Sequence, residues 1–428
     1  MKRNWHLDTL AVHAGQQSDP STTAQAVPLY RTAAYCFRDS QHASDLFSLQ
    51  EAGYIYSRLT NPTNDALEKR MAALEGGAAA LTLASGTAAI SFAITNILRS
   101  GDELVSTNNL YGGTYTLFDA ILPQQGITTR FTNVNDFDAL EASINDRTRA
   151  VFIELIGNPS LDVADIDRYA EIARRYHLPL LVDSTFTPPC LFRPLEHGAT
   201  IVIHSLSKWI GGHGTAIGGV VTDSGRFDWT DPKFRLYNDP DRGYHNLRFA
   251  HDLGDLNALA FILRLRTVGL RNQGPTLAPD SAWLFLQGLE SLPVRMERHC
   301  QNAYRVAQFL AGHAKVDWVR YPGLERDPSH ALAARYLPRG CGGMVVFGPR
   351  GGRDAARKLV DSIDLFSLVA NVGDAKSLII HPASTTHSQL SDQDQRDAGI
   401  APELIRLSIG LEHIDDIIAA LEDALAVI

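Results

Sequence analysis

The sequence predicts an α/β fold, in which helices cover both faces of a large, mostly parallel sheet and a smaller α/β unit follows toward the C-terminus. Short apolar segments alternate with helical segments from about Asn64 onward. The strand-like segments are almost wholly apolar, as strands buried on both faces of a parallel sheet are. With 428 residues, of which 45% are hydrophobic, the chain is long enough for two or three domains with cores of their own.

Changes in composition divide the chain into three parts. Residues 1–65 are rich in Thr, Ser, Gln and Tyr and lack a long periodic apolar segment, so we expect an extended N-terminal arm. Residues 66–285 are the expected large domain, which an irregular insertion interrupts at about residues 227–279. Residues 286–428 are the expected C-terminal domain.

The individual elements follow from apolar spacing, since helices repeat about every 3.6 residues and buried strands are short apolar runs. In the large domain we expect helices at 65–74, 87–98 and 166–176, and strands at 79–84, 103–106, 150–155, 180–182 and 200–204. Further along the chain we expect helical segments at 256–265, 281–310, 353–362 and 414–425, and strands at 344–347 and 404–409.

Charge and apolar content argue against several classes of protein. Lys and Arg total 39 against 48 Asp and Glu, a net charge of −9, and no long basic run occurs, which argues against a nucleic-acid partner. No apolar run reaches the ~20 residues that span a bilayer. The polar residues that follow Lys2 and Arg3 do not form the core of a signal peptide. We therefore expect a cytoplasmic protein without a membrane partner.

The spacing of cysteine and histidine does not indicate a metal site. The four cysteines form no C-x-x-C pair, so we expect buried free thiols, and neither a zinc site nor a disulfide framework. These cysteines are Cys36, Cys190, Cys300 and Cys341. His381 and His387 are separated by five residues, which precludes an H-x-x-x-H helix face.

Ser85-Gly86-Thr87 lies between a predicted strand and a predicted helix. The backbone N–H groups of Gly86 and Thr87 would then open the helix, where they can bind a phosphate. An ordinary helix cap is the commoner explanation of such a turn. No G-x-x-x-x-G-K-S/T loop occurs, so a nucleoside triphosphate site is not supported.

Asp183 and Lys208 each follow an apolar strand. A carboxylate at a strand end can meet a ligand at the edge of an open sheet, although a cap or a turn is the commoner role. The hydroxyls of Ser205 and Ser207 precede Lys208 and glycines follow it, which permits close approach of a bulky ligand. A lysine bound as an imine to pyridoxal phosphate needs a carboxylate on the pyridinium nitrogen, which Asp183 can supply. A solvated surface lysine is the alternative.

Four further side chains have candidate roles. Tyr111, between a strand and a helix, can stack on an aromatic ring or pack in the core. Tyr56 and Arg58 in the arm offer a hydroxyl and a guanidinium to a phosphate, or an oligomer contact. Arg406 stands in an apolar strand, where a buried guanidinium needs an anionic partner. We expect that partner to be a carboxylate ligand, with a structural ion pair as the alternative.

Taken together, these motifs resemble the γ-family of transsulfuration enzymes, the Cys/Met-metabolism group that uses pyridoxal phosphate. The resemblance covers nearly the whole chain. Its motifs are Tyr-Ile-Tyr-Ser-Arg at 54–58, Asn-Pro-Thr at 61–63, Ala-Ser-Gly-Thr-Ala-Ala at 84–89, Glu-Leu-Ile-Gly-Asn-Pro at 154–159, Val-Asp-Ser-Thr-Phe at 182–186, and the segments 204–214 and 406–412. The resemblance implies fold type I of the pyridoxal-phosphate-dependent transferases. Ser207 and Ser184 stand where the family more often has Thr and Asn.

Within this family the chain is most similar to the O-acetylhomoserine sulfhydrylases. The segments that carry this similarity are 370–377, 381–387, 287–290 and the insertion around Tyr244-His245. Cystathionine-processing relatives usually have Ser-Leu-Gly at 371–373 and lack the insertion, and methionine γ-lyases usually carry Cys at the position of Gly113. The resemblance implies replacement of the γ-acetate of O-acetyl-L-homoserine by sulfide, giving homocysteine, or by methanethiol, giving methionine.

Three alternatives stay open. The first is a γ-elimination lyase that makes 2-oxobutanoate and ammonia, and the second is an O-succinylhomoserine sulfhydrylase or cystathionine γ-synthase. The third is a non-catalytic relative of the same fold. The joint presence of Lys208, Asp183, Tyr111 and Arg406 argues against the third, because a binding protein does not need all four.

The resemblance also implies a role for each catalytic candidate. Lys208 would hold pyridoxal 5'-phosphate as the internal aldimine and then act as the base at Cα. Asp183 would pair with the pyridinium nitrogen, and Tyr111 would stack on the ring. Tyr56 would join these catalytic residues from a neighbouring subunit.

The remaining candidates would bind cofactor and substrate. The phosphate group would contact Ser85, the amides of Gly86 and Thr87, the hydroxyls of Ser205 and Ser207, and the neighbouring subunit's Tyr56 and Arg58. Asn158 would contact the phenolic oxygen of the ring. Arg406 would bind the α-carboxylate of the substrate, with Asn371 and Tyr56 beside it. The resemblance therefore implies a dimer as the smallest active unit, and a homotetramer as the assembly.

Overall fold

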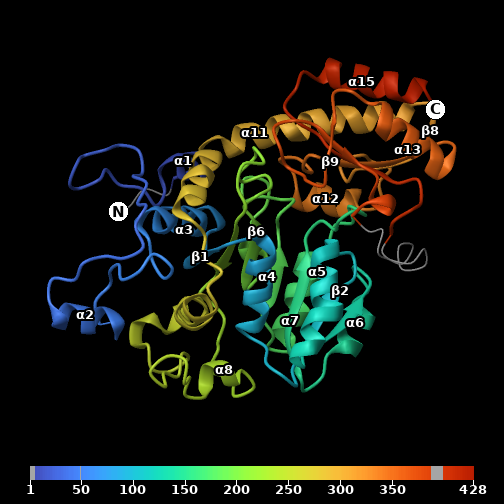
Figure 1. Cartoon of the computed structure of the whole chain (residues 1–428). Helices are drawn as coiled ribbons and strands as arrows, with labels where there is room; N and C mark the ends of the chain where they lie inside the picture. Colours follow the sequence, from blue (N-terminus) through green and yellow to red (C-terminus); the bar gives the residue numbers. More distant parts are fainter. Residues whose placement is uncertain (1–4, 49, 387–398) are drawn as a thin grey trace.

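A seven-stranded sheet and a five-stranded sheet organise the described part of the chain, residues 5–48, 50–386 and 399–428 of the computed structural model. In Figure 1 the larger sheet lies below the smaller one, and the long helix α11 (Pro279–Gly312) runs beside the smaller sheet at the top. The N-terminal arm projects to the left, away from the larger sheet. The α/β class predicted from the sequence is confirmed.

The larger sheet has the order β1-β7-β6-β5-β4-β2-β3, and its neighbouring strands are parallel except where β7 pairs with β1 and β6. Its strands are β1 (Ala79–Leu83), β2 (Glu103–Thr107), β3 (Thr128–Thr132), β4 (Thr148–Glu154), β5 (Leu180–Asp183), β6 (Ile201–Ser205) and β7 (Gly219–Asp223). The prediction did not include β3 and β7. Strand β3 has a single apolar residue, Phe131, and is partly exposed, so it lacks the continuous apolar run on which the other strands were recognised.

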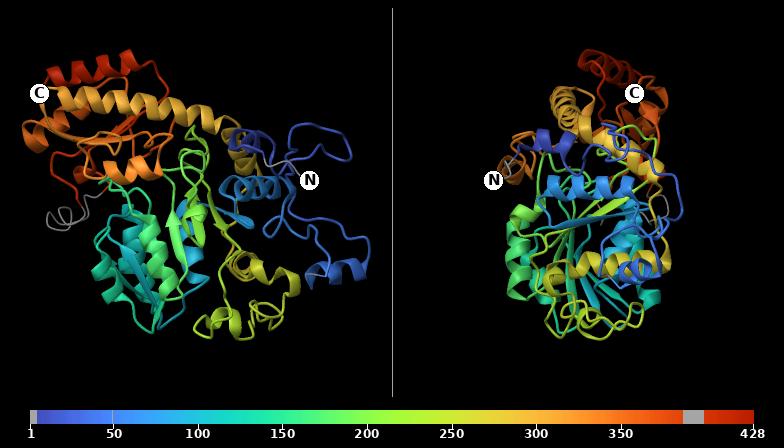
Figure 2. Two further views of the ribbon diagram at one scale, coloured as in Figure 1. Left: turned by 180° about the vertical axis from the view of Figure 1, so that it is seen from behind. Right: turned by 90° about the vertical axis from the view of Figure 1, so that its left-hand side faces the viewer.

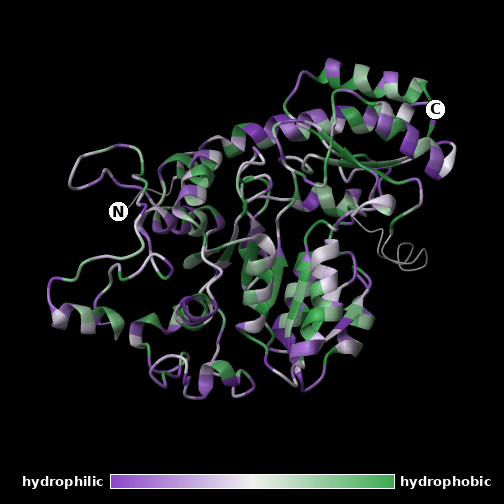
Figure 3. Ribbon diagram, in the orientation of Figure 1, coloured by the Kyte–Doolittle hydropathy of each residue, from purple (hydrophilic) through white to green (hydrophobic). Residues whose placement is uncertain are grey.

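Helices cover both faces of this sheet, because successive residues of a strand point to opposite faces. Leu181 packs on the face that α4 (Gly86–Thr95) covers, whereas Val182 packs with α3 (Pro62–Glu75) and α7 (Ile166–Arg175). Figure 3 shows the hydrophobic colour concentrated on these strands. Shorter helices lie between the strands: α5 (Gly112–Thr116), the π-helix Leu117–Ile121, the 3-10 helix Leu122–Gln125, α6 (Phe137–Ser143) and the 3-10 helix Pro194–His197.

The smaller sheet has the order β10-β11-β12-β9-β8. Its strands are β8 (Val316–Arg320), β9 (Met344–Pro349), β10 (Ser367–Leu368), β11 (Leu378–Ile380) and β12 (Ile405–Ser408), and its helices are α12 (His330–Tyr336), α13 (Gly352–Ser362), the 3-10 helix Pro382–Ser384 and α15 (Ile414–Ala426). Helix α11 is continuous from Pro279 to Gly312, so the boundary expected between residues 285 and 286 falls inside it. The division into domains stays a prediction.

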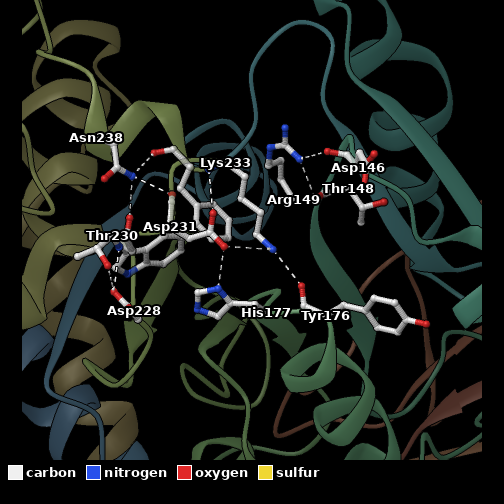
Figure 4. Close-up of polar contacts among 12 residues, drawn as sticks. Asp146, Thr148, Arg149, Tyr176, His177, Asp228, Thr230, Asp231, Lys233 and Asn238 are labelled. Atoms are coloured by element: carbon white, nitrogen blue, oxygen red, sulfur yellow. Dashed lines mark hydrogen bonds and ion pairs between the residues drawn. The ribbon is translucent and has the colours of Figure 1, made fainter.

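The insertion is helical but irregular. It contains α8 (Arg235–Asn238), the 3-10 helix Gly254–Leu259, α9 (Ala260–Arg264), the π-helix Leu265–Leu270 and α10 (Arg271–Gln273), where one α-helical run had been expected at 256–265. Polar contacts fasten its first residues to the turn after α7 (Figure 4): Asp231 Oδ2 lies 2.9 Å from His177 Nδ1, and Lys233 Nζ donates to the Tyr176 carbonyl at 2.9 Å.

The N-terminal arm contains two short helices, α1 (Leu7–His13) and α2 (Ser40–Phe47), within otherwise extended chain (Figure 2). Its contacts with the rest of the chain include a hydrogen bond of 2.8 Å from the Tyr244 hydroxyl to the Phe47 carbonyl. The Arg271 guanidinium lies over the rings of both residues. The insertion therefore supports the tip of the arm.

The cysteines are free, but one differs from the prediction. Cys190 and Cys300 are buried and Cys341 is half-buried, whereas Cys36 is exposed. The prediction of a buried thiol is wrong at Cys36, because this residue lies in a stretch of the arm that belongs to none of the core clusters. Within the described residues, no helix is long and apolar enough to cross a membrane.

Candidate active site

A cavity of about 790 Å³ lies at the carboxyl ends of β4, β5 and β6, and residues of the smaller sheet also line it. It brings together these predicted site residues: Ser85, Gly86, Thr87, Tyr111, Asn158, Asp183, Ser205, Ser207, Lys208, Asn371 and Arg406. Parallel strands end at the same edge of a sheet, where ligands bind in open α/β folds. Positions far apart in the sequence therefore meet at one site.

Lys208 follows β6 and points its amine across the cavity. Its Nζ donates a hydrogen bond of 2.6 Å to Asn371 Oδ1, so the side chain is held between the larger sheet and a loop of the C-terminal part. Burial, with a further contribution from the Arg406 charge, lowers the pKa of Lys208 to about 8. A buried amine of this kind is neutral, and hence nucleophilic, in a larger fraction of molecules near neutral pH than an exposed lysine is.

Asp183 is the last residue of β5 and is only 9% exposed. Its Oδ1 accepts a hydrogen bond of 2.9 Å from the Thr185 amide. Asp183 therefore also stabilises a turn, which was the alternative role considered from the sequence. Burial raises the pKa of Asp183, while the Thr185 hydrogen bonds and the His204 charge oppose that rise. A cationic nitrogen in the cavity would favour the ionised carboxylate.

The N-terminus of α4 forms one wall of the cavity. Ser85 is the N-cap, and its hydroxyl accepts from the Ala88 amide at 3.0 Å, so the ordinary cap is present. The first N–H groups of a helix have no acceptor within the helix, and those of Gly86 and Thr87 lie in the cavity wall. A methyl group on Gly86 would come within 2.7 Å of Ser205 Cβ, so only glycine allows the hydroxyl-bearing loop this close.

Tyr111 precedes α5 and is 48% exposed, with its ring on the cavity. A Cβ atom at position 113 would lie 2.6 Å from the Tyr111 ring. Glycine at this position therefore avoids a clash with the ring. The core-packing alternative for Tyr111 does not hold, because a core tyrosine would be buried.

Arg406 lies in the middle of β12 and is 5% exposed. Its Nη1 donates to Asn158 Oδ1 at 3.0 Å, and burial lowers its pKa to about 10. In the described part of the chain Arg406 has no carboxylate within ion-pair distance, which disagrees with the structural ion pair considered from the sequence. A buried guanidinium of this kind favours an anionic ligand.

Tyr56 and Arg58 do not line this cavity. Both are exposed in the arm, and the Arg58 guanidinium lies 5.3 Å from the centre of the Tyr56 ring. Their predicted roles assign them to the cavity of another subunit, so those roles stay a prediction.

The cavity also contains residues that the sequence did not single out. Glu154 ends β4, and Thr385 and Thr386 come from the loop after the 3-10 helix Pro382–Ser384. Glu154 was expected inside a strand at 150–155, whereas β4 ends at Glu154 itself, so it was not among the strand-end residues that the sequence singled out. The two threonines belong to the segment 381–387, whose last residue, His387, lies outside the described residues. His381 contacts the Pro402 carbonyl at 2.7 Å.

The residues of this cavity fit pyridoxal phosphate. An amine that can form an imine, a buried carboxyl group, an aromatic ring and a glycine-walled helix N-terminus with two nearby hydroxyls are gathered in one space. Each matches one part of that cofactor: its aldehyde, its ring nitrogen, its ring face and its phosphate. No group of three or more potential metal ligands is found among the described residues.

Known proteins of similar sequence span the same length. The chain is 50% identical to the O-acetyl-L-homoserine sulfhydrylase of Leptospira meyeri, over 99% of this chain and 98% of that protein. It is 52% identical to the homocysteine synthase of Schizosaccharomyces pombe, with the same shares covered. A solved structure from Campylobacter jejuni, named as an O-acetylhomoserine (thiol)-lyase, contains N'-pyridoxyl-lysine-5'-monophosphate. It is 42% identical, with a TM-score of 0.95 over 99% of this chain and 100% of that one.

The family model described as Cys/Met metabolism PLP-dependent enzyme matches residues 8–426. This match includes both sheets and every cavity residue named above. The fold, the cavity and the relatives agree with it, and so does the resemblance inferred from the motifs. The chain therefore belongs to the Cys/Met metabolism family of pyridoxal-phosphate-dependent enzymes.

Proposed function

We propose that this enzyme replaces the γ-acetate of O-acetyl-L-homoserine by sulfide, giving homocysteine, or by methanethiol, giving methionine. The observation that carries the proposal is the cavity itself, in which a nucleophilic lysine, a buried carboxyl group and a buried arginine lie together. The names of the relatives at about half identity over the whole chain support the same substrate and product.

Lys208 is the proposed attachment point and base. Bound pyridoxal phosphate supplies an electron sink that stabilises negative charge at Cα and allows loss of the γ-substituent. Lys208 would hold the cofactor through its Nζ and, when free, would supply the base at Cα, since burial lowers its pKa to about 8. Its hydrogen bond to Asn371 keeps the released amine in the cavity.

Asp183 and Tyr111 hold the ring in place. The Asp183 carboxylate pairs with the ring nitrogen and keeps it protonated. An ion pair at ~4 Å is worth about 4 kcal/mol at an effective dielectric constant of 20, or about three pKa units. Tyr111 covers the ring face.

Arg406 binds the α-carboxylate of the substrate. Asn158 Oδ1 accepts from one of its nitrogens and so orients the guanidinium, and Asn158 also contacts the phenolic oxygen of the ring. Asn371 lies near the same carboxylate. A charge-assisted hydrogen bond of this kind gives both affinity and orientation.

The phosphate site needs two subunits. Ser85, the amides of Gly86 and Thr87, and the hydroxyls of Ser205 and Ser207 supply one side, and the neighbour's Tyr56 and Arg58 supply the other, with Tyr56 also reaching substrate. The exposure of both arm residues supports this arrangement. It makes a dimer the smallest active unit, and we propose a homotetramer of two such dimers. We also propose that the enzyme is cytoplasmic, because its free cysteines are typical of proteins in a reducing compartment.

Product analysis tests the function. The purified enzyme is given O-acetyl-L-homoserine with and without sulfide, and homocysteine, 2-oxobutanoate and ammonia are measured. We expect homocysteine with sulfide and little 2-oxobutanoate without it. Release of 2-oxobutanoate as the main product in the presence of sulfide would identify a γ-elimination lyase instead.

The acyl donor is tested in parallel. O-succinylhomoserine replaces O-acetylhomoserine at equal concentration, and kcat/KM is compared for the two donors. We expect the acetyl ester to be preferred. Preference for the succinyl ester would overturn the proposed substrate, while leaving the family and the cofactor in place.

A further inference from the structure

A second buried carboxyl group lies beside Asp183 in the cavity. Glu154 ends β4 and Asp183 ends β5, and the two are register partners of these parallel strands. Register partners project from the same face of a sheet, and both side chains line the cavity with exposed fractions of only 5% and 9%. Two carboxyl groups therefore share one corner of the cofactor site, although the proposed mechanism uses one.

Glu154 has a contact that Asp183 lacks. Its Oε1 accepts a hydrogen bond of 2.7 Å from the backbone N–H of Tyr111. The Tyr111 ring projects from this backbone into the same cavity. The carboxyl group of Glu154 therefore sets the position of the residue that is proposed to cover the ring of the cofactor.

The charges at this corner favour one carboxylate and one carboxylic acid. Burial and the neighbouring Asp183 raise the pKa of Glu154 well above its usual range, against the hydrogen bond from Tyr111. Asp183 is the better anion, because the Thr185 hydrogen bonds and the His204 charge oppose the effect of burial on its pKa. The cavity's cations, Lys208 and Arg406, donate to Asn371 and Asn158 instead.

We propose that Glu154 is a positioning residue that stays a neutral carboxylic acid beside the ionised Asp183 and holds the Tyr111 backbone against the cofactor ring. The inference rests on the proposed function only in placing pyridoxal phosphate in this cavity. It makes the Asp183 carboxylate the single negative partner of the ring nitrogen.

Two substitutions of Glu154 test its proposed role. Glu154→Gln keeps the shape of the neutral acid and an oxygen that accepts from the Tyr111 amide. Glu154→Leu removes that acceptor. Asp223→Asn is the matched control, because Asp223 is also a buried carboxyl group whose pKa burial raises to about 7, but it lies at the far end of β7, outside the cavity.

Cofactor binding is measured on the apo-forms by titration with pyridoxal phosphate alone, with the Tm of each apo-form as a check of folding. We expect Glu154→Leu to weaken the affinity about 10- to 100-fold, because the Tyr111 amide loses its acceptor in a buried site. We expect Glu154→Gln to recover most of that loss. Asp223→Asn is expected to change Tm alone.

The pH at which the absorbance of the bound cofactor changes is the second readout. Removing a negative neighbour lowers the pKa of a cationic group, so an ionised Glu154 would make this midpoint fall by about one unit in Glu154→Gln. A neutral Glu154 leaves it within about 0.3 unit of the wild type.

Two results would overturn the inference. One is wild-type cofactor affinity in Glu154→Leu, and the other is a lowered midpoint in Glu154→Gln. If Glu154→Leu does not fold, the midpoint in Glu154→Gln decides alone. Failure of the wild-type protein to bind pyridoxal phosphate would contradict the cofactor assignment, whereas a product other than homocysteine would contradict only the proposed function.

Discussion

The cavity and the N-terminal arm carry residues of the same proposed site, but the fold supports them in opposite ways. Asp183 and Arg406 are buried at the ends or in the middle of strands, so their positions are set by sheet geometry. Tyr56 is 42% exposed, and it lies in the arm, outside both sheets. In the proposed arrangement one chain supplies the cofactor end of one site and the arm of another, and assembly would join them.

Substitution of Lys208 should have the largest effect on the activity of the cavity. Lys208→Ala should lose the yellow absorbance of the lysine-bound cofactor and reduce kcat by at least about 10⁴-fold, because both the covalent attachment and the base are lost. Absorbance and turnover are measured on the same preparation. A variant with full activity would contradict the assignment of Lys208.

Arg406 tests the substrate side of the cavity. Arg406→Gln should raise KM for O-acetylhomoserine about 10- to 100-fold, with a smaller effect on kcat, because a charge-assisted contact to the carboxylate is lost. Arg406→Lys is the control that keeps the charge, and it should recover part of the loss. An unchanged KM in Arg406→Gln would remove Arg406 from substrate binding.

Mixed subunits test whether the arm serves a neighbour. Arg58→Ala should weaken cofactor affinity about 10-fold or more, and Lys208→Ala is inactive. When the two variants are refolded together in equal amounts, about a quarter of all sites combine an intact arm with an intact cavity if the arm acts across the interface. At a cofactor concentration that leaves most Arg58→Ala sites empty, activity should therefore rise above that of either variant. If the arm acts within its own chain, mixing adds nothing.

The pH dependence of cofactor capture tests the environment of Lys208. Burial lowers the pKa of Lys208 to about 8, and only the neutral amine attacks an aldehyde. The capture rate of the apo-protein should therefore rise about tenfold per pH unit below pH 8 and level off above it, instead of rising toward pH 10. Arg406→Gln should move the midpoint upward, since a positive neighbour is removed. Stopped-flow absorbance between pH 6.5 and 9.5 measures both.

The smallest expected effect concerns the support of the arm. Tyr244→Phe removes the hydrogen bond to the Phe47 carbonyl, which is worth about 0.5–1.5 kcal/mol. Hydrogen–deuterium exchange of α2 should accelerate, while cofactor affinity changes by less than about threefold. Tyr304→Phe, at an exposed tyrosine of α11, is the control. Unchanged exchange in α2 would show that Tyr244 does not hold the arm.

The sequence predicted those parts of the molecule whose signal is local. Strands such as β5 are apolar runs, and Asp183 and Lys208 were recognised because each follows such a run. Strand β11, Leu378–Ile380, was missed because it has only three residues, too few for a period to be recognised. Its pairing with β12 depends on contacts between residues far apart in the sequence, which a local sequence pattern does not reveal.

The structure places the predicted cavity residues together in the lining of one cavity. Glu154 was missed because its importance comes from its partners, the Asp183 carboxyl group and the Tyr111 amide, and these meet only in the folded sheet. Tyr56 and Arg58 illustrate the opposite case. Their motif is recognisable in the sequence, but a single chain does not contain the cavity to which they are assigned.

The number of residues in helix α11 is constrained more strictly than the identity of its exposed residues. Its 34 residues span about 51 Å, and it packs against α1 and α3 at one end and β8 and α15 at the other. Between them, Arg295 donates to the Trp209 carbonyl at 2.8 Å, one residue beyond Lys208. One residue inserted or deleted would turn everything beyond it by about 100°. Homologous enzymes should therefore tolerate substitutions on its exposed face but keep its residue count constant.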